Sequence, residues 1–322
     1  MYKNIYLIKN NNGDNMIFVY IENSSFLSKI IYFLQCSGIK YTTDLNSSYS
    51  SILIAEVNHK TIKLIEENYD KQIIFITYLD ENKILRCFNS NNKRSIEVRN
   101  KYSSFFRKCN KLIVSLSYFK NILSEYCYNI DVIPHIMIPF NQGLKNINER
   151  YSLNKRKKKV IIIDLYYDNL EYIYNLTNKY PKFEYIYIGY KPSYLLSNKK
   201  LELLHKLPSN VIYIPYIDLF VLQDLLKVSY IVVDFNSYKL GIEYMYLIIM
   251  MRKYYLLFNN VLYRDLLIPS KNCYCFNELE EFISRFDKIV NGRVMNLSDN
   301  NFELIKSFTF EEVIKKYRES LK

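Results

Sequence analysis

The residues with the most evident chemistry are the basic side chains between Lys83 and Lys111. This segment holds nine Lys or Arg residues against one acid, Glu97, so its net charge is +8. Aromatic residues alternate with the cations, as in elements that lie on anionic lipid surfaces. A solvated helix face over a few core aromatics fits the pattern equally well. The membrane interpretation assigns docking to Arg94, Arg99, Lys101, Phe105, Phe106, Arg107 and Lys108.

Other side chains capable of chemistry give weaker signals. The three histidines stand apart from cysteines and acids, so no metal site is expected. His135, next to Pro134, fits a packed loop residue better than a ligand-binding role. Asp164 and Asp234 stand at or near the ends of apolar runs. A carboxylate there would repel a bound diphosphate, so neither is expected to contact phosphate directly.

Composition limits the class of protein. The 322 residues allow two domains, and the net charge of +12 implies an acidic partner, either anionic lipid or a phosphorylated ligand. Nucleic acid is not expected, because no recognised motif accompanies the charge. Residues 1–15 are polar where a signal peptide would be apolar, and no segment approaches the ~18 apolar residues of a membrane span. With six scattered cysteines and no C-x-x-C pair, we expect a cytoplasmic protein, peripheral at the inner face of the cell membrane.

Apolar runs alternate with helical periodicity through the second half of the chain. The expected strands are 160–165, 183–189, 211–214, 230–235, 254–258 and 272–276. The expected helices are 169–179, 199–206, 218–228, 242–251, 277–290 and 309–322. This alternation predicts right-handed βαβ units and a parallel sheet covered on both faces.

The first half repeats the pattern, with strands at 16–21, 52–56, 72–77 and 112–115. Helices are expected at 25–37, closed by Gly38, and at 61–68 and 117–126. A polar linker at 142–159 ends in the basic run Lys155–Lys159. We therefore predict an α/β protein with two Rossmann-like, doubly wound domains, 1–150 and 151–322, the final helix returning to the first. Ligands are expected in a cleft between them, beyond the carboxyl ends of the strands.

Several short motifs, in this order and spacing, have counterparts in a known family. They include GIKYTTD at 38–44, FEYIYIGY at 183–190, LPSNV at 207–211 and YRDLL at 263–267. From Met16 to Lys322 the chain resembles bacterial GT-B glycosyltransferases of the retaining family 4 type, in particular those that glycosylate diacylglycerol lipids. The resemblance implies a nucleotide-sugar donor held by the second domain, a lipid or membrane-proximal acceptor, and no cofactor or metal. The leaving diphosphate then needs positive charge or backbone N–H donors.

The sequence departs from the family pattern at four places. The turn 21–26 lacks the usual glycines, and Phe75 and Thr77 stand where a histidine is usual. Asn169 and Leu170 replace an Arg and a Lys that reach the diphosphate. A neutral pair cannot offset diphosphate charge as those cations do.

The fourth departure concerns two glutamates that the family spaces around a glycine. Counting from Gly241, Tyr238 and Tyr246 occupy these positions, and Glu243 lies nearby. Tyrosine can bind a ribose hydroxyl, but without the charge-assisted strength of a carboxylate. Lys239 and Arg264 are candidates to replace the missing positive charge.

Two functions remain open at this point. The first is a hexosyltransferase with eroded catalytic positions, in which weak or absent turnover is expected. The second is a non-catalytic pseudo-glycosyltransferase that scaffolds an active paralogue, binds a partner or docks on a membrane. No catalytic residue is assigned. The donor-site candidates are Asn169, Tyr238, Lys239, Gly241, Glu243, Tyr246 and Arg264.

Overall fold

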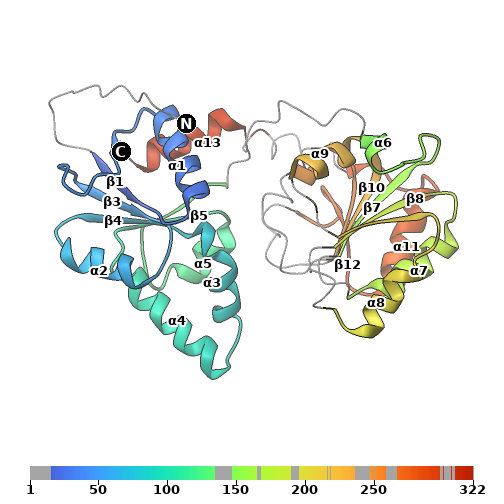
Figure 1. The fold of residues 1–322 in the computed structure, drawn as a ribbon, viewed down its shortest axis with the longest axis horizontal. Helices are drawn as coiled ribbons and strands as arrows, with labels where there is room; N and C mark the ends of the chain where they lie inside the picture. Colours follow the sequence, from blue (N-terminus) through green and yellow to red (C-terminus); the bar gives the residue numbers. More distant parts are fainter. Residues whose placement is uncertain are drawn as a thin grey trace. The chain divides into compact units, whose positions relative to one another are not determined.

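The chain forms two compact units, each with its own sheet (Figure 1). The computed structural model describes residues 16–134, 147–164, 168–189, 196–215, 217, 219–235, 247–249, 251–258, 267–297, 300, 306 and 309–321. Unit 1 combines Met1–Pro134 with Glu311–Lys322, and unit 2 is His135–Phe310. Each unit holds a six-stranded parallel sheet with helices, so the predicted α/β class with two Rossmann-like domains is confirmed. The boundary at 150/151 stays a prediction.

The sheet of unit 1 has the strand order β2-β1-β3-β4-β5-β6, with every neighbouring pair parallel. The strands are β1 (Ile17–Tyr20), β2 (Tyr41–Thr42), β3 (Ser51–Ile54), β4 (Gln72–Ile76), β5 (Lys111–Val114) and β6 (Ile130–Val132). The central strands are continuous apolar runs because helices cover both faces of the sheet. The sequence analysis missed β2 and β6, which lie at the two edges and are short and only partly buried.

In unit 1, capping residues mark both ends of the first helix. The helices of unit 1 include α1 (Ser24–Cys36), α2 (His59–Glu67), α3 (Glu81–Phe88), α4 (Lys93–Phe106) and α5 (Ser117–Leu123), with a short 3-10 helix, η1 (Thr77–Leu79). The side chain of Asn23 caps α1 by accepting the N–H of Phe26 at 3.0 Å. As predicted, Gly38 closes α1, with a positive φ of 68° that other residues rarely adopt.

The last helix, α13 (Phe310–Ser320), packs on unit 1. The Tyr317 ring is 1% exposed and stacks on Phe33 of α1 with 5.9 Å between ring centroids. The Nε of Arg318 donates to the carbonyl oxygen of Ser37 at 3.0 Å. The residues that close the core of unit 1 are therefore separated in the chain by the whole of unit 2.

The sheet of unit 2 has the order β12-β11-β10-β7-β8-β9, again parallel throughout. Its strands are β7 (Lys159–Ile163), β8 (Glu184–Ile188), β9 (Val211–Ile214), β10 (Ser229–Asp234), β11 (Tyr254–Phe258) and β12 (Tyr274–Phe276). Its helices include α6 (Ile147–Arg150), α7 (Leu170–Lys179), α8 (Asn198–His205), α9 (Leu219–Val228) and α11 (Leu279–Val290). Buried aromatic rings, among them Tyr185, Phe282 and Phe286, fill the space between the sheet and α7 and α11.

Candidate functional site at the strand ends

The topology of unit 2 makes the carboxyl end of β7 a candidate ligand-binding position. The strands β8 and β9 follow β7 on one side, and β10 returns to its other side. Open parallel sheets bind ligands at the carboxyl ends of the two strands between which the strand order reverses. Asp164 follows β7 directly, and Asp234 ends β10 opposite Ile163. The two carboxylates consequently lie at the carboxyl ends of adjacent strands.

Asp164 is buried, and described neighbours hold its carboxylate. Its exposed fraction is 2%. One oxygen accepts the N–H of Asn169 at 2.9 Å and the hydroxyl of Tyr187 at 2.9 Å, and the other accepts the N–H of Asp168 at 3.3 Å. Burial raises the pKa of Asp164, and these hydrogen bonds oppose the shift. The carboxylate thus links the end of β7 to the two residues that precede α7.

Asp234 has a comparable environment on the neighbouring strand. It is 0% exposed and accepts the hydroxyl of Tyr255 at 2.9 Å. Tyr255 lies on β11, as Tyr187 lies on β8, so each buried carboxylate is held by a tyrosine of the next strand outward. Sequence reasoning missed this pairing, because tyrosines inside an apolar strand look like core residues until their partners are known.

The predicted donor-site residue Asn169 lies at the start of α7. Its side-chain nitrogen is 3.5 Å from Asp164, and its backbone N–H is bound to the same carboxylate. Leu170 is buried in the core, so a lysine at that position would bury its charge. The side-chain amine of Lys200, on α8, pairs with Asp168 at 2.5 Å and brings a positive charge to the turn. The sequence analysis did not single out Lys200.

The remaining donor-site candidates lie outside the described residues. They are Tyr238, Lys239, Gly241, Glu243, Tyr246 and Arg264.

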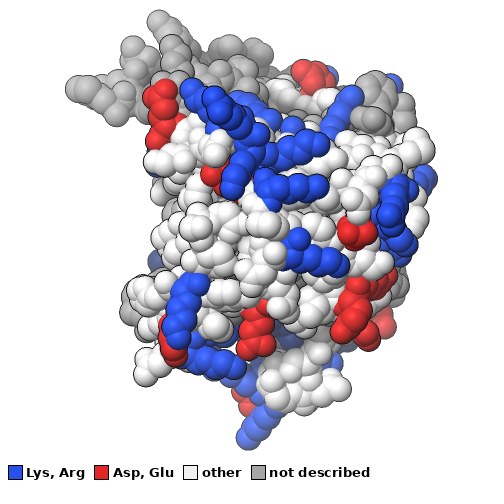
Figure 2. Space-filling view, turned by 90° about the vertical axis from the view of Figure 1, so that its right-hand side faces the viewer, with Lys and Arg blue, Asp and Glu red and all other residues white. Residues whose placement is uncertain are grey.

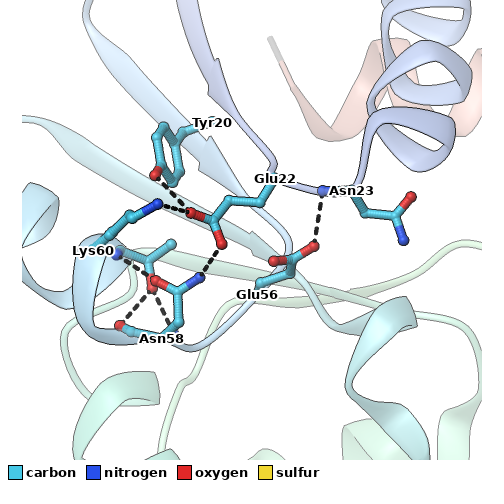
Figure 3. Close-up of polar contacts among 7 residues, drawn as sticks. Tyr20, Glu22, Asn23, Glu56, Asn58 and Lys60 are labelled. Atoms are coloured by element: carbon cyan, nitrogen blue, oxygen red, sulfur yellow. Dashed lines mark hydrogen bonds and ion pairs between the residues drawn. The ribbon is translucent and has the colours of Figure 1, made fainter.

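Unit 1 has an equivalent position between β1 and β3, where β2 and β3 flank β1. Figure 3 shows polar side chains converging there on the carboxylate of Glu22. Lys60 pairs with Glu22 at 2.8 Å, the side-chain amide of Asn58 donates to it at 3.1 Å, and the Tyr20 hydroxyl donates at 3.3 Å. Close by, the N–H of Asn23 donates to a carboxylate oxygen of Glu56 at 3.2 Å.

This Glu22 cluster is exposed; Lys60 balances the charge of Glu22, and Glu56 adds a second carboxylate nearby. The hydrogen bond from Lys60 lowers the pKa of Glu22, and Glu22 raises the pKa of Lys60. Glu22 is therefore ionised near neutral pH and accepts hydrogen bonds, whereas Lys60 and Asn58 donate them. Such a mixture suits hydroxyl-rich ligands better than a diphosphate, since Glu22 and Glu56 would repel an anion.

The positions where the family has a histidine belong to the core of unit 1. Phe75 is fully buried between the rings of Phe105 and Phe106, at centroid distances of 5.1 and 5.8 Å. The hydroxyl of Thr77 donates to the buried Glu81 at 2.9 Å. These residues hold β4 against α3 and α4, and they present no imidazole for catalysis.

The predicted membrane segment folds into α3 and α4, and part of that prediction is wrong. Phe105 and Phe106 are 3% and 0% exposed, so neither can insert into a bilayer. Arg99 donates to the carbonyl oxygens of Cys87 and Ser90, and Lys108 pairs with Glu66 at 3.0 Å. Arg94 and Lys101 are exposed on this surface and make no such hydrogen bond or ion pair with described residues. Docking through this surface stays a prediction.

Within the described part of the chain, no group of three His, Cys, Asp or Glu side chains is placed to hold a metal. No helix formed by the described residues is long and apolar enough to cross a membrane. None of the six cysteines, all of which the structure describes, forms a disulfide bond.

Of the comparisons with known proteins, the one with solved structures identifies the fold. No protein-family model matches the sequence, and neither does any curated protein. Among solved structures, the chain is similar to a sucrose-phosphate synthase from Thermosynechococcus elongatus, with 10% identity, 91% of this chain and 76% of that chain covered, and a TM-score of 0.65. WaaG, a glycosyltransferase involved in lipopolysaccharide biosynthesis, matches with 8% identity, 96% and 99% coverage, and a TM-score of 0.58.

A third similar structure is a UDP-GlcNAc 2-epimerase from Neisseria meningitidis bound to UDP-GlcNAc. It matches with 13% identity, 95% coverage of this chain and 99% of that chain, and a TM-score of 0.58. At these identities the likeness shows the fold alone. The chain therefore has the GT-B fold, on which both sugar transfer and sugar epimerisation are carried out.

Proposed function

We propose that this chain is a glycosyltransferase homologue that binds a nucleotide sugar at the carboxyl edge of the unit 2 sheet and turns it over weakly or not at all. The GT-B fold supports the nucleotide sugar, because similar structures include a protein bound to UDP-GlcNAc. The proposed acceptor is a lipid or another membrane-proximal molecule. The basic surface of α3 and α4 and the likeness to WaaG support that acceptor.

The observation that carries the proposal is the turn before α7. A diphosphate needs N–H donors or cations at this point. Here the carboxylate of Asp164 already occupies the N–H groups of Asp168 and Asn169. The side chain of Asn169 is neutral, and Lys200 is paired with Asp168. A donor can bind through its nucleoside and sugar, but the leaving diphosphate receives little stabilisation from Asp168 and Asn169, the described residues that precede α7.

A thermal-shift titration with UDP, GDP and their sugar conjugates tests donor binding, because a ligand that binds the folded state raises the unfolding temperature. Product analysis of the same mixtures separates transfer, epimerisation and hydrolysis. A concentration-dependent shift with slow or absent product formation is expected. The absence of any shift would contradict the donor site, and rapid product formation would contradict the weak turnover.

A charge substitution locates the diphosphate at this turn. Asn169→Arg places a cation beside the expected diphosphate and should tighten nucleotide diphosphate binding by about tenfold, since a charge-assisted hydrogen bond contributes roughly 1.5 kcal/mol. Ser209→Arg adds the same charge before β9, at the opposite edge of the sheet, and should leave the affinity unchanged. Equal effects of the two variants would mean that only the net charge matters.

The second candidate function is a non-catalytic module, which the buried Asp164 also favours. If no donor shifts the unfolding temperature, the remaining role is to bind a partner such as an active paralogue. Titration with a nucleoside that lacks phosphates distinguishes the two candidates further, because a retained nucleoside pocket would still bind it.

A further inference from the structure

The loop before β7 presents four consecutive cations that the proposed donor site does not use. Lys155, Arg156 and Lys158 are exposed, and Lys157 is half-buried. Among the ion pairs of the described residues, none involves these four side chains. Neighbouring like charges are unfavourable in a folded protein unless an anion shares the site. The loop therefore presents a strong positive charge to its surroundings.

This loop has a defined backbone. The carboxylate of Glu184 accepts the N–H of Asn154 at 3.0 Å, and the Asn154 side chain accepts the N–H of Arg156 at 2.9 Å. The buried amine of Lys159 donates to the carbonyl oxygens of Asn154 and Lys157 at 2.7 and 3.0 Å. The backbone that carries the cations is consequently held in place around a hollow of about 490 Å³, which Tyr230 also lines.

The same edge of the sheet collects further cations. Because all strands of unit 2 are parallel, the residues before β7, β8, β10 and β11 lie side by side at the amino edge. Lys182, Lys227, Arg252 and Lys253 hold these positions, and the amine of Lys227 pairs with Asp224 at 2.7 Å. Figure 2 views the side of the molecule to which the loop before β7 points, and it shows blue side chains gathered in the upper part of this face. We call this surface the basic edge.

An exposed apolar residue stands beside the basic edge. Met295 is 80% exposed, although its carbonyl oxygen is fixed by the Tyr274 hydroxyl at 2.7 Å. The next residue, Asn296, donates from its side chain to the carbonyl oxygen of Arg252 at 3.2 Å. The methionine is thus held outward next to the cations that precede β11. Cations around a projecting apolar side chain are the arrangement that docks on anionic bilayers.

We propose that the basic edge of unit 2 docks on an anionic lipid bilayer, with lipid phosphates at Lys155–Lys158 and Met295 in the headgroup layer. Single-stranded nucleic acid fits this edge less well, because the nearest aromatic ring, Tyr230, is already covered by the Lys158 amine at 4.2 Å and by the ring of Tyr254. The docking requires no sugar transfer, so it does not depend on the proposed function.

Vesicle sedimentation tests the proposal with the full chain. Lys155→Ser/Arg156→Ser/Lys157→Ser/Lys158→Ser should lose about 100- to 1,000-fold in binding to phosphatidylcholine vesicles that contain phosphatidylserine. A second variant with the same loss of charge, Arg94→Ser/Lys101→Ser/Arg107→Ser/Lys108→Ser, tests the rival surface on α4 and its C-terminal end. It should lose much less binding than the first variant, because Arg107 and Lys108 already contact Tyr126 and Glu66. Far-UV circular dichroism confirms folding. If the first variant fails to fold, Lys155→Ser/Arg156→Ser at two exposed positions replaces it, with a smaller expected loss.

Three further results decide the outcome. Binding should vanish on vesicles of phosphatidylcholine alone and weaken with added salt, whereas Met295→Ser should cause a smaller loss that salt does not change. A loss confined to the α4 variant would move the docking surface to unit 1 and overturn the proposal. Binding of duplex DNA that depends on Lys155–Lys158, without vesicle binding, would overturn it in favour of a nucleic acid.

Discussion

Replacing Asp164 with asparagine tests whether this carboxylate organises the turn before α7. The carboxylate accepts two backbone N–H groups and one hydroxyl. A hydrogen bond to a charged group contributes roughly 1.5–3 kcal/mol, and an asparagine keeps one acceptor oxygen while turning an N–H₂ group toward the donors. Asp164→Asn should therefore lower the free energy of unfolding of unit 2 by about 2–4 kcal/mol.

A double-mutant cycle tests whether Tyr187 is the hydrogen-bond partner of Asp164. Tyr187→Phe alone should cost about 1–2 kcal/mol, but much less in the Asp164→Asn background, because the charged acceptor is already gone. Tyr185→Phe is the matched control on the same strand, since its hydroxyl donates to the carbonyl oxygen of Tyr180 at 3.0 Å and not to Asp164. Its cost should be the same in both backgrounds.

Urea denaturation followed by circular dichroism gives these free energies. The proposed role of the Asp164 carboxylate would be refuted by an Asp164→Asn variant as stable as the wild type. It would also be refuted if the stability losses of Asp164→Asn and Tyr187→Phe were fully additive. The carboxylate would then be available for a ligand, contrary to the argument made for weak turnover.

Two further predictions concern unit 1. Burial raises the pKa of Glu81 above its ordinary value of 4.5, so the folded state binds this proton more tightly, and its contribution to stability is lost as the pH rises through the folded pKa. The difference in unfolding free energy between wild type and Glu81→Gln should therefore shrink as the pH is raised from 4.5, and a difference that grows would contradict the raised pKa. Tyr317→Ala should destabilise unit 1 by about 3–5 kcal/mol in urea denaturation, whereas Tyr128→Ala, at a fully exposed ring, should not.

The sequence predicted the architecture because parallel sheets covered by helices require continuous apolar strands. Runs such as 160–163 are buried on both faces, so their pattern is unambiguous. The ends of helices were harder to predict, because several polar side chains near a helix start can bind the same backbone N–H groups. The helix expected at 277–290 begins at Leu279, and Asn277, ahead of it, donates from its backbone and side chain to Glu281 at 2.9 and 3.1 Å.

The candidate site was only partly predictable. Asn169 was placed correctly at the start of α7, because the spacing from β7 fixes it. The hydrogen bonds that Asn169 and Tyr187 donate to Asp164 could not be predicted, because β7 and β8 become neighbours only in the folded sheet. Phe105 and Phe106 show the reverse error, since aromatic residues among cations look alike in sequence whether they face lipid or the protein core.

The position of α13 has a consequence for biosynthesis. The ribosome completes residues 16–134 long before it reaches Tyr317, because the 135–310 segment must be translated in between, which takes roughly 10–35 s at usual elongation rates. During that interval the surface around Phe33 that Tyr317 later covers is open to water. Unit 2 can meanwhile fold as a continuous segment. Nascent unit 1 should therefore be the form that chaperones recognise, and release of the completed chain should end that recognition.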